Sequence, residues 1–450
     1  MTELVSPAAP AFRGEAAAAR YSALFCSLLW PRYPGHSGGE IRDFHLVQHL
    51  ASLCQLEFFA LHHLPGEEQQ DPLAAHVHAL HDPRTISLSR PDLLDPEPLP
   101  AKVLDRLVRR IRRARLPLLG PRYHFDVEEQ LVNARTWTLG ALAEAVRTRP
   151  PDFLFVSPQV NPVGLLLSPS PRTRTVLASY DVERVRMDRL AAAAHGLAAL
   201  ALRLEAARAR RFEAENLRRF DGVIAVSELD RRIYVDEYGL PPERVLVVEN
   251  GVDPAYFSYR PRRREGPPRV LYVGNLRYPP NAQAALRLLR RIMPRLWAQV
   301  PDAEVVVLGA GPPPELLAEK RDRVKVTGLV EDVRPYLADA WVGCFPLLAG
   351  SGTKYKVLEA LSAGLPLVCS PLAAEGLALE HGSHLLVGEG DEDIAAGLAR
   401  VIGDASLAGA LAERGRAQVE RHYAWSVNLP RVGAWLEWLR GAPAGRRQEP

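Results

Sequence analysis

Short apolar runs alternate with longer amphipathic stretches along most of the chain. Short apolar runs predict buried strands, and their alternation with helical patterns is typical of parallel, doubly wound α/β sheets. The strands we expect are residues 21–29, 56–61, 153–156, 175–178, 221–227 and 245–248, followed by 270–273, 303–308, 324–327, 342–346 and 366–370. Residues 184–220 predict one long helical stretch.

A charged, proline-containing stretch without apolar periodicity divides this pattern into two halves. We take this stretch, residues 259–268, as the linker between an N-terminal domain at 20–258 and a C-terminal domain at 269–425. Residues 1–19 have no uninterrupted apolar run and predict a mobile leader. Residues 426–450 predict a terminal helix and a tail.

The composition is that of an ordinary globular protein. Of the 450 residues 47% are apolar and 24% are charged, and the formal charge of +3 is too small to indicate nucleic-acid binding. The four cysteines form no Cys-x-x-Cys pair. Cys26, Cys344 and Cys369 lie in apolar, strand-like runs and predict buried free thiols in a reducing cytosol. Because no apolar run reaches the ~20 residues that span a bilayer, we expect a soluble or peripheral protein.

The segment 350–366 carries the clearest candidate chemistry. A glycine-bracketed turn exposes backbone N–H groups, Lys354 and Lys356 follow, and Glu359 lies in the amphipathic helical run behind them. Backbone donors, a helix N-terminus and two ammonium groups together suit a diphosphate. A carboxylate one turn deeper suits ribose hydroxyls. The alternative is a solvated lysine pair at an ordinary loop-to-helix turn.

This segment resembles the nucleotide-sugar site of the retaining glycosyltransferases of family four, group 1. It is most similar to the bacterial exopolysaccharide-type subgroup, whose loop reads Gly-Ser-Gly-Thr-Lys-x-Lys-x-x-Glu-Ala. Residues 248–257, 271–281, 374–377 and 423–425 also fit the family pattern. The resemblance implies the α/β GT-B fold, in which two doubly wound, Rossmann-like domains face each other across a cleft. It also implies that the last helix crosses back to the N-terminal domain.

The function implied by the resemblance is transfer of a sugar from a nucleotide-diphosphate sugar to a glycan or lipid-linked glycan, with retention of configuration. We expect the protein in the cytoplasm, in cell-envelope or exopolysaccharide assembly. No Asp-x-Asp pair occurs in the segments assigned to the cleft. We therefore expect no metal and no cofactor, with lysines stabilising the leaving diphosphate.

The expected donor-binding residues combine both halves of the chain. They are Gly352, Thr353, Lys354, Lys356, Glu359, Arg277, Gly38, Gly39 and Val330. Gly38 and Gly39 follow the first strand and let a phosphate or an acceptor approach the backbone, the alternative being a plain turn. By resemblance, the backbone around Val330 lies near the nucleobase.

The family pattern is not matched everywhere. Ser351 stands where many members carry the first glutamate of a Glu-x7-Glu pair, and Tyr180 where many carry a histidine. Asn275 and Asn281 stand where many carry an arginine and a lysine. The charge of the phosphates must then be met by the lysines of the loop or by Arg277.

The expected catalytic residues are Lys356, Lys354, Asp181 and Tyr180. A tyrosine with an ordinary pKa near ~10 is a poor base but a good hydrogen-bond donor to a sugar. Asp181 or Glu183 is expected to orient the acceptor hydroxyl, the alternative for Asp181 being the cap of the following helix. Glu375 is expected to contact acceptor or sugar hydroxyls, or else to cap a turn.

Residues 66–100 are polar and proline-rich and predict a loop. The basic amphipathic segment 103–115 predicts either peripheral contact with an anionic membrane or a solvated helix face packed on the domain.

Two other functions remain open at this stage. One is a GT-B nucleotide-sugar epimerase, which needs no acceptor, and the other is a catalytically inactive GT-B partner protein. A phosphorylase would need a lysine for pyridoxal phosphate, which no residue identifies.

Overall fold

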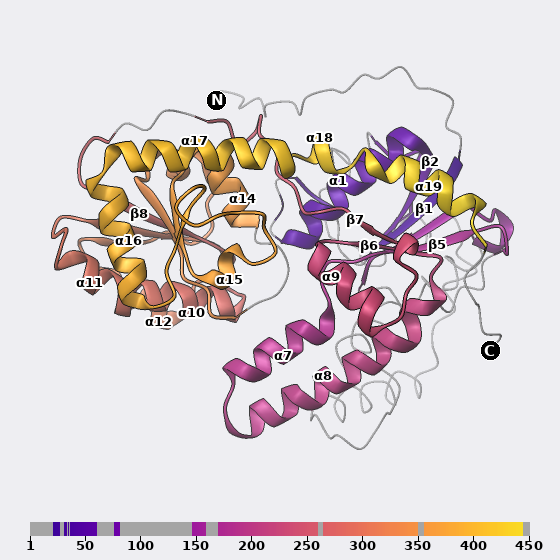
Figure 1. Ribbon diagram of the computed structural model, residues 1–450, viewed down its shortest axis with the longest axis horizontal. Coiled ribbons are helices and arrows are strands. Elements are labelled where there is room, and N and C mark those ends of the chain that lie inside the picture. The colour runs from indigo at the N-terminus through magenta and orange to yellow at the C-terminus, as the bar shows by residue number, and fades with distance from the viewer. Residues whose placement is uncertain are drawn as a thin grey trace, which may run out of the picture.

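In the computed structural model, two parallel β-sheets lie side by side, each with helices packed against it (Figure 1). The structure describes residues 21–27, 31–33, 35, 37–60, 76–81, 146–158, 170–259, 264–349 and 355–443. The segment 103–115 lies outside these residues, as does the loop 350–354 that precedes Lys356. The α/β class predicted from the alternation is confirmed.

The first sheet has seven strands in the order β3-β2-β1-β4-β5-β6-β7. These are β1 (Tyr21–Ser27), β2 (Cys54–Ala60), β3 (Ala79–His81), β4 (Phe153–Val156), β5 (Arg174–Ala178), β6 (Gly222–Ala225) and β7 (Val245–Val247). Its main helices are α1 (Gly38–Leu53), α7 (Glu183–Ala193), α8 (Gly196–Asn216) and α9 (Glu228–Arg232). Cys26 pairs with Phe59 on one side and with Val156 on the other, and all three are buried, as expected where helices cover both faces of a sheet. β3 is an edge strand within the stretch predicted as loop, and this part of the prediction is wrong.

The second sheet has six strands in the order β10-β9-β8-β11-β12-β13. They are β8 (Arg269–Val273), β9 (Glu304–Leu308), β10 (Val324–Val326), β11 (Val342–Phe345), β12 (Leu367–Cys369) and β13 (Leu386–Val387). The helices that matter below are α10 (Pro279–Arg287), α12 (Pro314–Leu317), α14 (Tyr355–Ser362), α15 (Pro371–Ala374), α16 (Asp391–Gly403) and α17 (Ala405–His422). The strand order reverses between β8 and β11, and between β1 and β4 in the first sheet. Open α/β sheets bind ligands beyond the carboxyl ends of the strands at such reversals.

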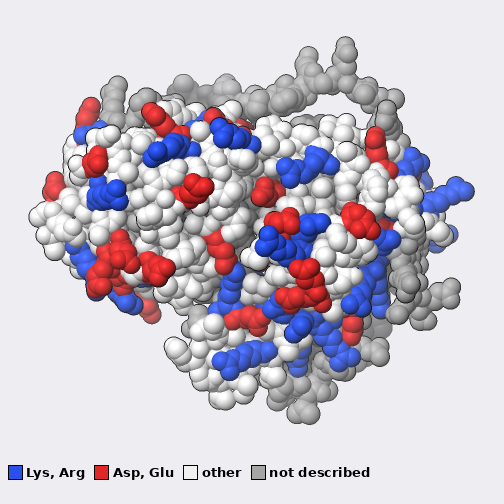
Figure 2. Space-filling view, viewed as in Figure 1, with Lys and Arg blue, Asp and Glu red and all other residues white. Residues whose placement is uncertain are grey.

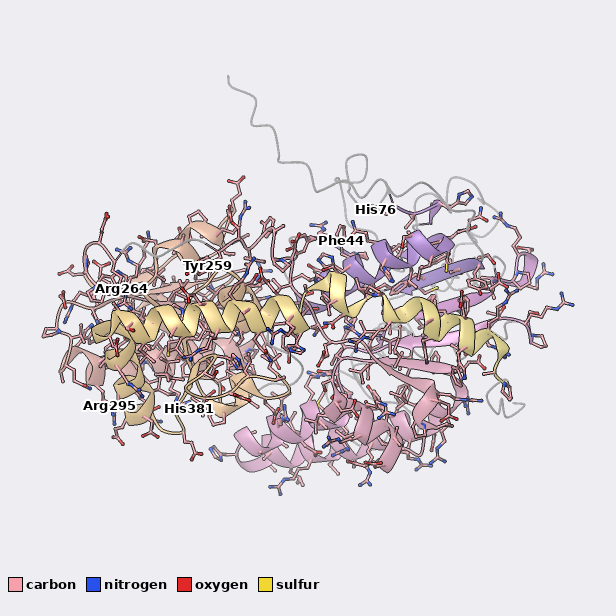
Figure 3. All side chains as sticks on the ribbon, turned by 45° about the horizontal axis from the view of Figure 1, so that its top comes forward. Phe44, His76, Tyr259, Arg264, Arg295 and His381 are labelled. Carbon is pink, nitrogen blue, oxygen red and sulfur yellow. The ribbon has the colours of Figure 1, made fainter. Side chains whose placement is uncertain are left out.

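The two halves are joined twice. The first connection includes residues 260–263. Tyr259 and Arg264, on either side of this range, both lie on the second half (Figure 3). Arg264 donates hydrogen bonds to the carbonyls of Ile402 and Val401, at 3.0 and 2.8 Å. After α17, the helices α18 (Trp425–Asn428) and α19 (Arg431–Gly441) run onto the first half (Figure 1). There the Trp435 ring lies so close to Gly222 that a Cβ on this glycine would be 2.5 Å from it.

The long helical stretch predicted at 184–220 is broken into a hairpin of two helices, α7 and α8. The chain turns at Ala194 and His195, and Gly196 has φ +59°, which glycine adopts without steric cost. The hairpin projects from the first half of the molecule (Figure 1).

Cys26, Cys344 and Cys369 are buried free thiols, as predicted, and Cys54 is a fourth. Within the described residues no single helix is long and apolar enough to cross a membrane; α16 and α17 pass that test only as a pair, and the pair is bent by 103°.

Candidate donor and acceptor site between the two halves

Lys356 is held at the strand-order reversal of the second sheet. It lies in the first turn of α14, whose Val357, Leu358 and Leu361 are buried in the core. The Lys356 ammonium donates a hydrogen bond to Asn281 Oδ1 at 2.6 Å and lies 5.6 Å from the centre of the Tyr272 ring. A positive charge is thereby fixed at the carboxyl end of β8, the edge at which open α/β sheets bind ligands.

The two asparagines that depart from the family pattern both take part in this arrangement. Asn281 donates from Nδ2 to the carbonyl of Asn275 at 2.8 Å, which orients its oxygen toward Lys356. Asn275 in turn accepts a hydrogen bond from the backbone N–H of Arg277 at 3.1 Å. The two asparagines therefore carry no charge themselves, but they fix the position of the Lys356 ammonium.

The glycine turn at 309–311 makes room for the β8 turn. A Cβ on Gly309 would lie 1.7 Å from the carbonyl oxygen of Gly274. A Cβ on Gly311, which has φ +62°, would lie 2.3 Å from Cγ of Arg277. Arg277 is exposed and lies over this turn, within the same part of the site as Asn275.

Glu359 lies one turn further along α14 and is half-buried. Burial raises the pKa of its carboxyl group to about 7, and the nearby ammonium of Lys356 partly opposes this rise. Burial raises the pKa of Tyr33 and of Tyr256, and the charge of Glu359 adds to both rises. The Tyr33 and Tyr256 ring centres are 5.3 Å apart. Glu359 thus shares its surroundings with an aromatic residue from the loop after β1.

The glycine loop of the first half meets α14 directly. Ser37 caps α1 by accepting a hydrogen bond from the N–H of Glu40, so Gly38 and Gly39 form the first turn of this helix. A Cβ on Gly38 would lie 2.9 Å from the ring of Tyr355. Gly38 therefore lets the two halves approach at the residue next to Lys356.

Beneath this contact lies a buried polar network that the sequence did not reveal. Asp43 Oδ2 accepts hydrogen bonds from the Tyr180 hydroxyl at 2.5 Å and from the Ser27 hydroxyl at 2.8 Å. The fully buried Arg42 donates through Nη1 to the Val248 carbonyl and to Asn250, each at 2.9 Å. Burial raises the pKa of Asp43 to about 7, although the hydrogen bonds from Tyr180 and Ser27 and the charge of Arg42 oppose the rise.

Several polar atoms of this region have no hydrogen-bond partner among the described residues. They are Oδ1 of Asp43, Nε and Nη2 of Arg42, and the hydroxyl of Tyr355. Buried polar groups are normally paired, so these atoms indicate where water or a ligand would be held. The only sequence signal was an adjacent Arg-Asp pair in the amphipathic helix after the glycine loop.

The acidic residues expected at the acceptor side are engaged in other contacts. The carboxylate of Glu183 pairs with Arg186, and that of Glu375 pairs with Arg189 at 2.6 Å across the two halves. The N-cap residue of α7 is Val182, which makes no side-chain cap. Instead Glu213 accepts from the N–H groups of Glu183 and Arg184, at 2.8 and 3.4 Å. Both roles considered for Asp181, orientation of the acceptor and capping of the helix, stay predictions.

The remaining sequence-based candidates are only partly placed. Ser351, Gly352, Thr353 and Lys354 lie outside the described residues. Val330 is half-buried in the turn after β10. Among the described residues no group of His, Cys, Asp and Glu side chains is arranged to hold a metal ion.

A cavity of about 870 Å³ lies away from this site. It is lined by residues such as Leu217, Arg218, Gly222 and Gly239. Because Gly222 begins β6, the cavity lies at the amino end of that strand. We assign the site to the other edge, where the polar network and Lys356 lie.

Comparison with known proteins identifies the family. The model described as Glycosyltransferase Family 4 matches residues 36–256, and that described as Glycosyl transferases group 1 matches residues 267–404. The chain belongs to the family 4, group 1 glycosyltransferases. The predicted membership of this family is thereby confirmed, whereas retention of configuration and the subgroup stay predictions.

The curated relatives match part of the chain. The phosphatidyl-myo-inositol mannosyltransferase of Mycolicibacterium smegmatis is 32% identical over 232 residues, 49% of this chain and 58% of that protein. The glycogen synthase of Mycobacterium tuberculosis is 26% identical over 178 residues, 36% of this chain and 40% of that protein. The chain therefore spans about half the length of these relatives.

Solved structures share the fold over nearly the whole chain. Anabaena HepE in complex with UDP and glucose has a TM-score of 0.60 at 14% identity, covering 93% of this chain and 99% of HepE. Sucrose-phosphate synthase from Thermosynechococcus elongatus has a TM-score of 0.66 at 15% identity, covering 94% of this chain and 100% of that one. At such identities the likeness shows the fold alone, and it confirms the GT-B prediction.

Proposed function

We propose that this glycosyltransferase family member transfers a sugar from a nucleotide-diphosphate sugar to a glycan or lipid-linked glycan acceptor, with retention of configuration and without a metal ion. The observation that carries the proposal is the position of Lys356. Its ammonium is fixed by Asn281 at the β8–β11 reversal, and Glu359 follows on the same helix. The lipid-linked acceptor is supported by the curated relatives, which include a phosphatidyl-myo-inositol mannosyltransferase.

In this proposal the residues have distinct roles. The bond between the anomeric carbon and the diphosphate oxygen breaks, and negative charge develops on the diphosphate beside Lys356. A preorganised cation is most effective where charge develops during the reaction. Glu359 accepts hydrogen bonds from the ribose. The acceptor oxygen bonds to the anomeric carbon, and its proton passes to the departing diphosphate. Tyr180, held by Asp43, contacts the sugar.

The first experiment is a thermal-shift panel of nucleotides and nucleotide sugars, because a ligand that binds only the native state raises Tm. UDP-glucose is the first donor to include, since HepE has been solved with it. The donor that raises Tm is then incubated with candidate glycan acceptors, and the anomeric configuration of the product is read by NMR. Turnover without any acceptor would favour the epimerase, whereas donor binding without any transfer or hydrolysis would favour the inactive partner.

Transfer should survive chelation. Because Lys356 supplies the positive charge at the proposed diphosphate position, no divalent cation is needed there. We expect initial rates in excess EDTA to equal those in added Mg²⁺ or Mn²⁺. Complete loss of transfer in EDTA that either cation restores would contradict the lysine-based mechanism.

Tyr180→Phe should destabilise the protein more at alkaline pH than at acidic pH. The folded pKa of Asp43 is raised to about 7, so the folded state binds more protons than the unfolded state, and stability falls as pH rises toward that value. Below the pKa of Asp43, the substitution removes a hydrogen bond to a neutral carboxyl group, at a cost of about 1 kcal/mol of stability. Above it, the bond lost is to a carboxylate, and the cost is about 1.5–3 kcal/mol.

Urea unfolding at about pH 5.5 and about pH 8.5 measures this difference. Tyr259→Phe is the matched control, because the 38%-exposed Tyr259 lies outside the Asp43 network. An equal cost of Tyr180→Phe at both pH values would mean that Asp43 does not titrate in this range.

A further inference from the structure

The tip of the α7–α8 hairpin exposes an apolar face. Leu197, Leu200 and Leu204 are 86%, 55% and 47% exposed. Their spacing of three and four residues places them on one side of α8. The other large exposed hydrophobic residues among those described are not clustered in this way along a helix; they include Leu229, Leu317, Leu329 and Leu348.

The hairpin does not need these leucines for its own packing. The buried residues of α8 are small or lie further along the helix: Ala206 is 3% exposed and Ala209 is fully buried. From α7, Met187 and Ala191 are buried at 5% and 3% exposure. The face that α8 buries is thus the one opposite the leucines, and the leucine face is exposed.

The charges beside the leucines are mainly positive. Residues 196–211 contain four arginines and one glutamate, and this glutamate, Glu205, pairs with Arg208. Arg203 and Arg210 are exposed and have no acidic partner within the described part of the chain. Figure 2 shows this region as a largely uncharged projection with basic side chains next to it.

The same hairpin borders the proposed acceptor side of the site. α7 begins three residues after Tyr180, and its Arg189 forms the ion pair with Glu375 of the second half. A surface that bound the tip of the hairpin would therefore lie close to the proposed acceptor side of the site.

We propose that the α7–α8 tip inserts Leu197, Leu200 and Leu204 into an anionic lipid surface, with Arg203 and Arg210 at the level of the headgroups. This inference rests on the proposed function, because it places the site beside a lipid-linked acceptor. Apolar side chains flanked by arginines are the combination that binds such surfaces. The attraction of the arginines is screened by salt, so binding should be reversible and sensitive to ionic strength.

The test is flotation of the full-length chain with vesicles of equal parts phosphatidylglycerol and phosphatidylcholine, and with vesicles of phosphatidylcholine alone. We expect binding to the anionic vesicles at low salt and little binding to the neutral ones. Leu197→Ser/Leu200→Ser/Leu204→Ser should lower the partition coefficient by about tenfold or more. Arg203→Gln/Arg210→Gln should lower it by about fivefold per charge and weaken its dependence on salt.

The matched control is Leu229→Ser/Leu317→Ser, which removes two exposed leucines from α9 and α12, and it should bind like the wild type. Absence of wild-type binding to anionic vesicles at low salt would overturn the proposal. So would a triple serine variant that binds normally. A wild-type dimer that the triple variant converts to a monomer, without vesicle binding, would assign the face to a second copy of the chain instead.

Failure of this inference can be told apart from failure of the proposed function. Donor binding by calorimetry and transfer to a detergent-solubilised acceptor need no vesicle, and the leucine variant should retain both. Vesicle binding that depends on the leucines, in a protein that transfers no sugar, would support the lipid-binding surface and reject the activity.

Discussion

Replacing Lys356 with alanine should lower kcat for sugar transfer by about a hundredfold to a thousandfold, as expected for a preorganised charge at a developing anion. The ammonium is fixed by a 2.6 Å hydrogen bond to Asn281, so no side-chain rearrangement is needed when the diphosphate departs. We expect a larger loss than for Lys354→Ala, because the Lys356 side chain is anchored in the site. Initial rates at saturating donor measure the effect.

Two further variants test whether the loss of kcat is specific to the Lys356 ammonium. Lys325→Ala removes an exposed lysine from β10 and should leave kcat unchanged. Asn281→Ala keeps the ammonium but removes its anchor, and should therefore lower kcat by less than Lys356→Ala does. A Lys356→Ala variant with wild-type kcat would remove this residue from the proposed chemistry.

The fold was readable from the sequence because its strands are buried on both faces. Such strands read as continuous apolar runs, as Phe153–Val156 does, and these runs need no knowledge of the partner strand. Three features escaped this reasoning. One is the two-residue edge strand β13. The three-residue edge strand β3 is too short to produce a pattern, and the break between α7 and α8 lies in an alanine-rich stretch whose helical propensity continues up to Gly196.

Only the part of the site that lies within one short segment could be predicted from the sequence. Lys356 and Glu359 share a helix, so their spacing alone suggested a phosphate and a ribose contact. The hydrogen bond from Lys356 to Asn281 joins residues 75 positions apart, and the sequence alone suggested only that a cation was missing at Asn281.

The contact between Asp43 and Tyr180 spans 137 positions. Nothing in the spacing of these residues indicated that they meet. Partners of this kind are set by the strand order of the first sheet and the packing of its helices, which a single sequence does not display. The same limit applies to Glu375, whose ion pair with Arg189 joins the two halves of the chain.

Donor affinity should rise with pH up to about 7 and level off above it, through the titration of Glu359. Burial raises the pKa of the free carboxyl group to about 7. Ribose hydroxyls donate hydrogen bonds to the ionised form, so the pKa in the complex should be lower and binding should release a proton. Below about pH 7, each unit of rising pH should therefore lower the dissociation constant of the donor by up to about tenfold.

Glu359→Gln should weaken donor binding at about pH 8.5 by roughly ten- to a hundredfold, since a hydrogen bond to a charged group contributes about 1.5–3 kcal/mol. At about pH 5.5 the loss should be much smaller, because the wild-type carboxyl group is then mostly protonated. Calorimetry with the donor at both pH values gives the two constants, and Glu413→Gln on the exposed face of α17 is the matched control. A pH dependence that persists unchanged in Glu359→Gln would assign the titration to another group, and an unchanged affinity at both pH values would exclude Glu359 from the donor site.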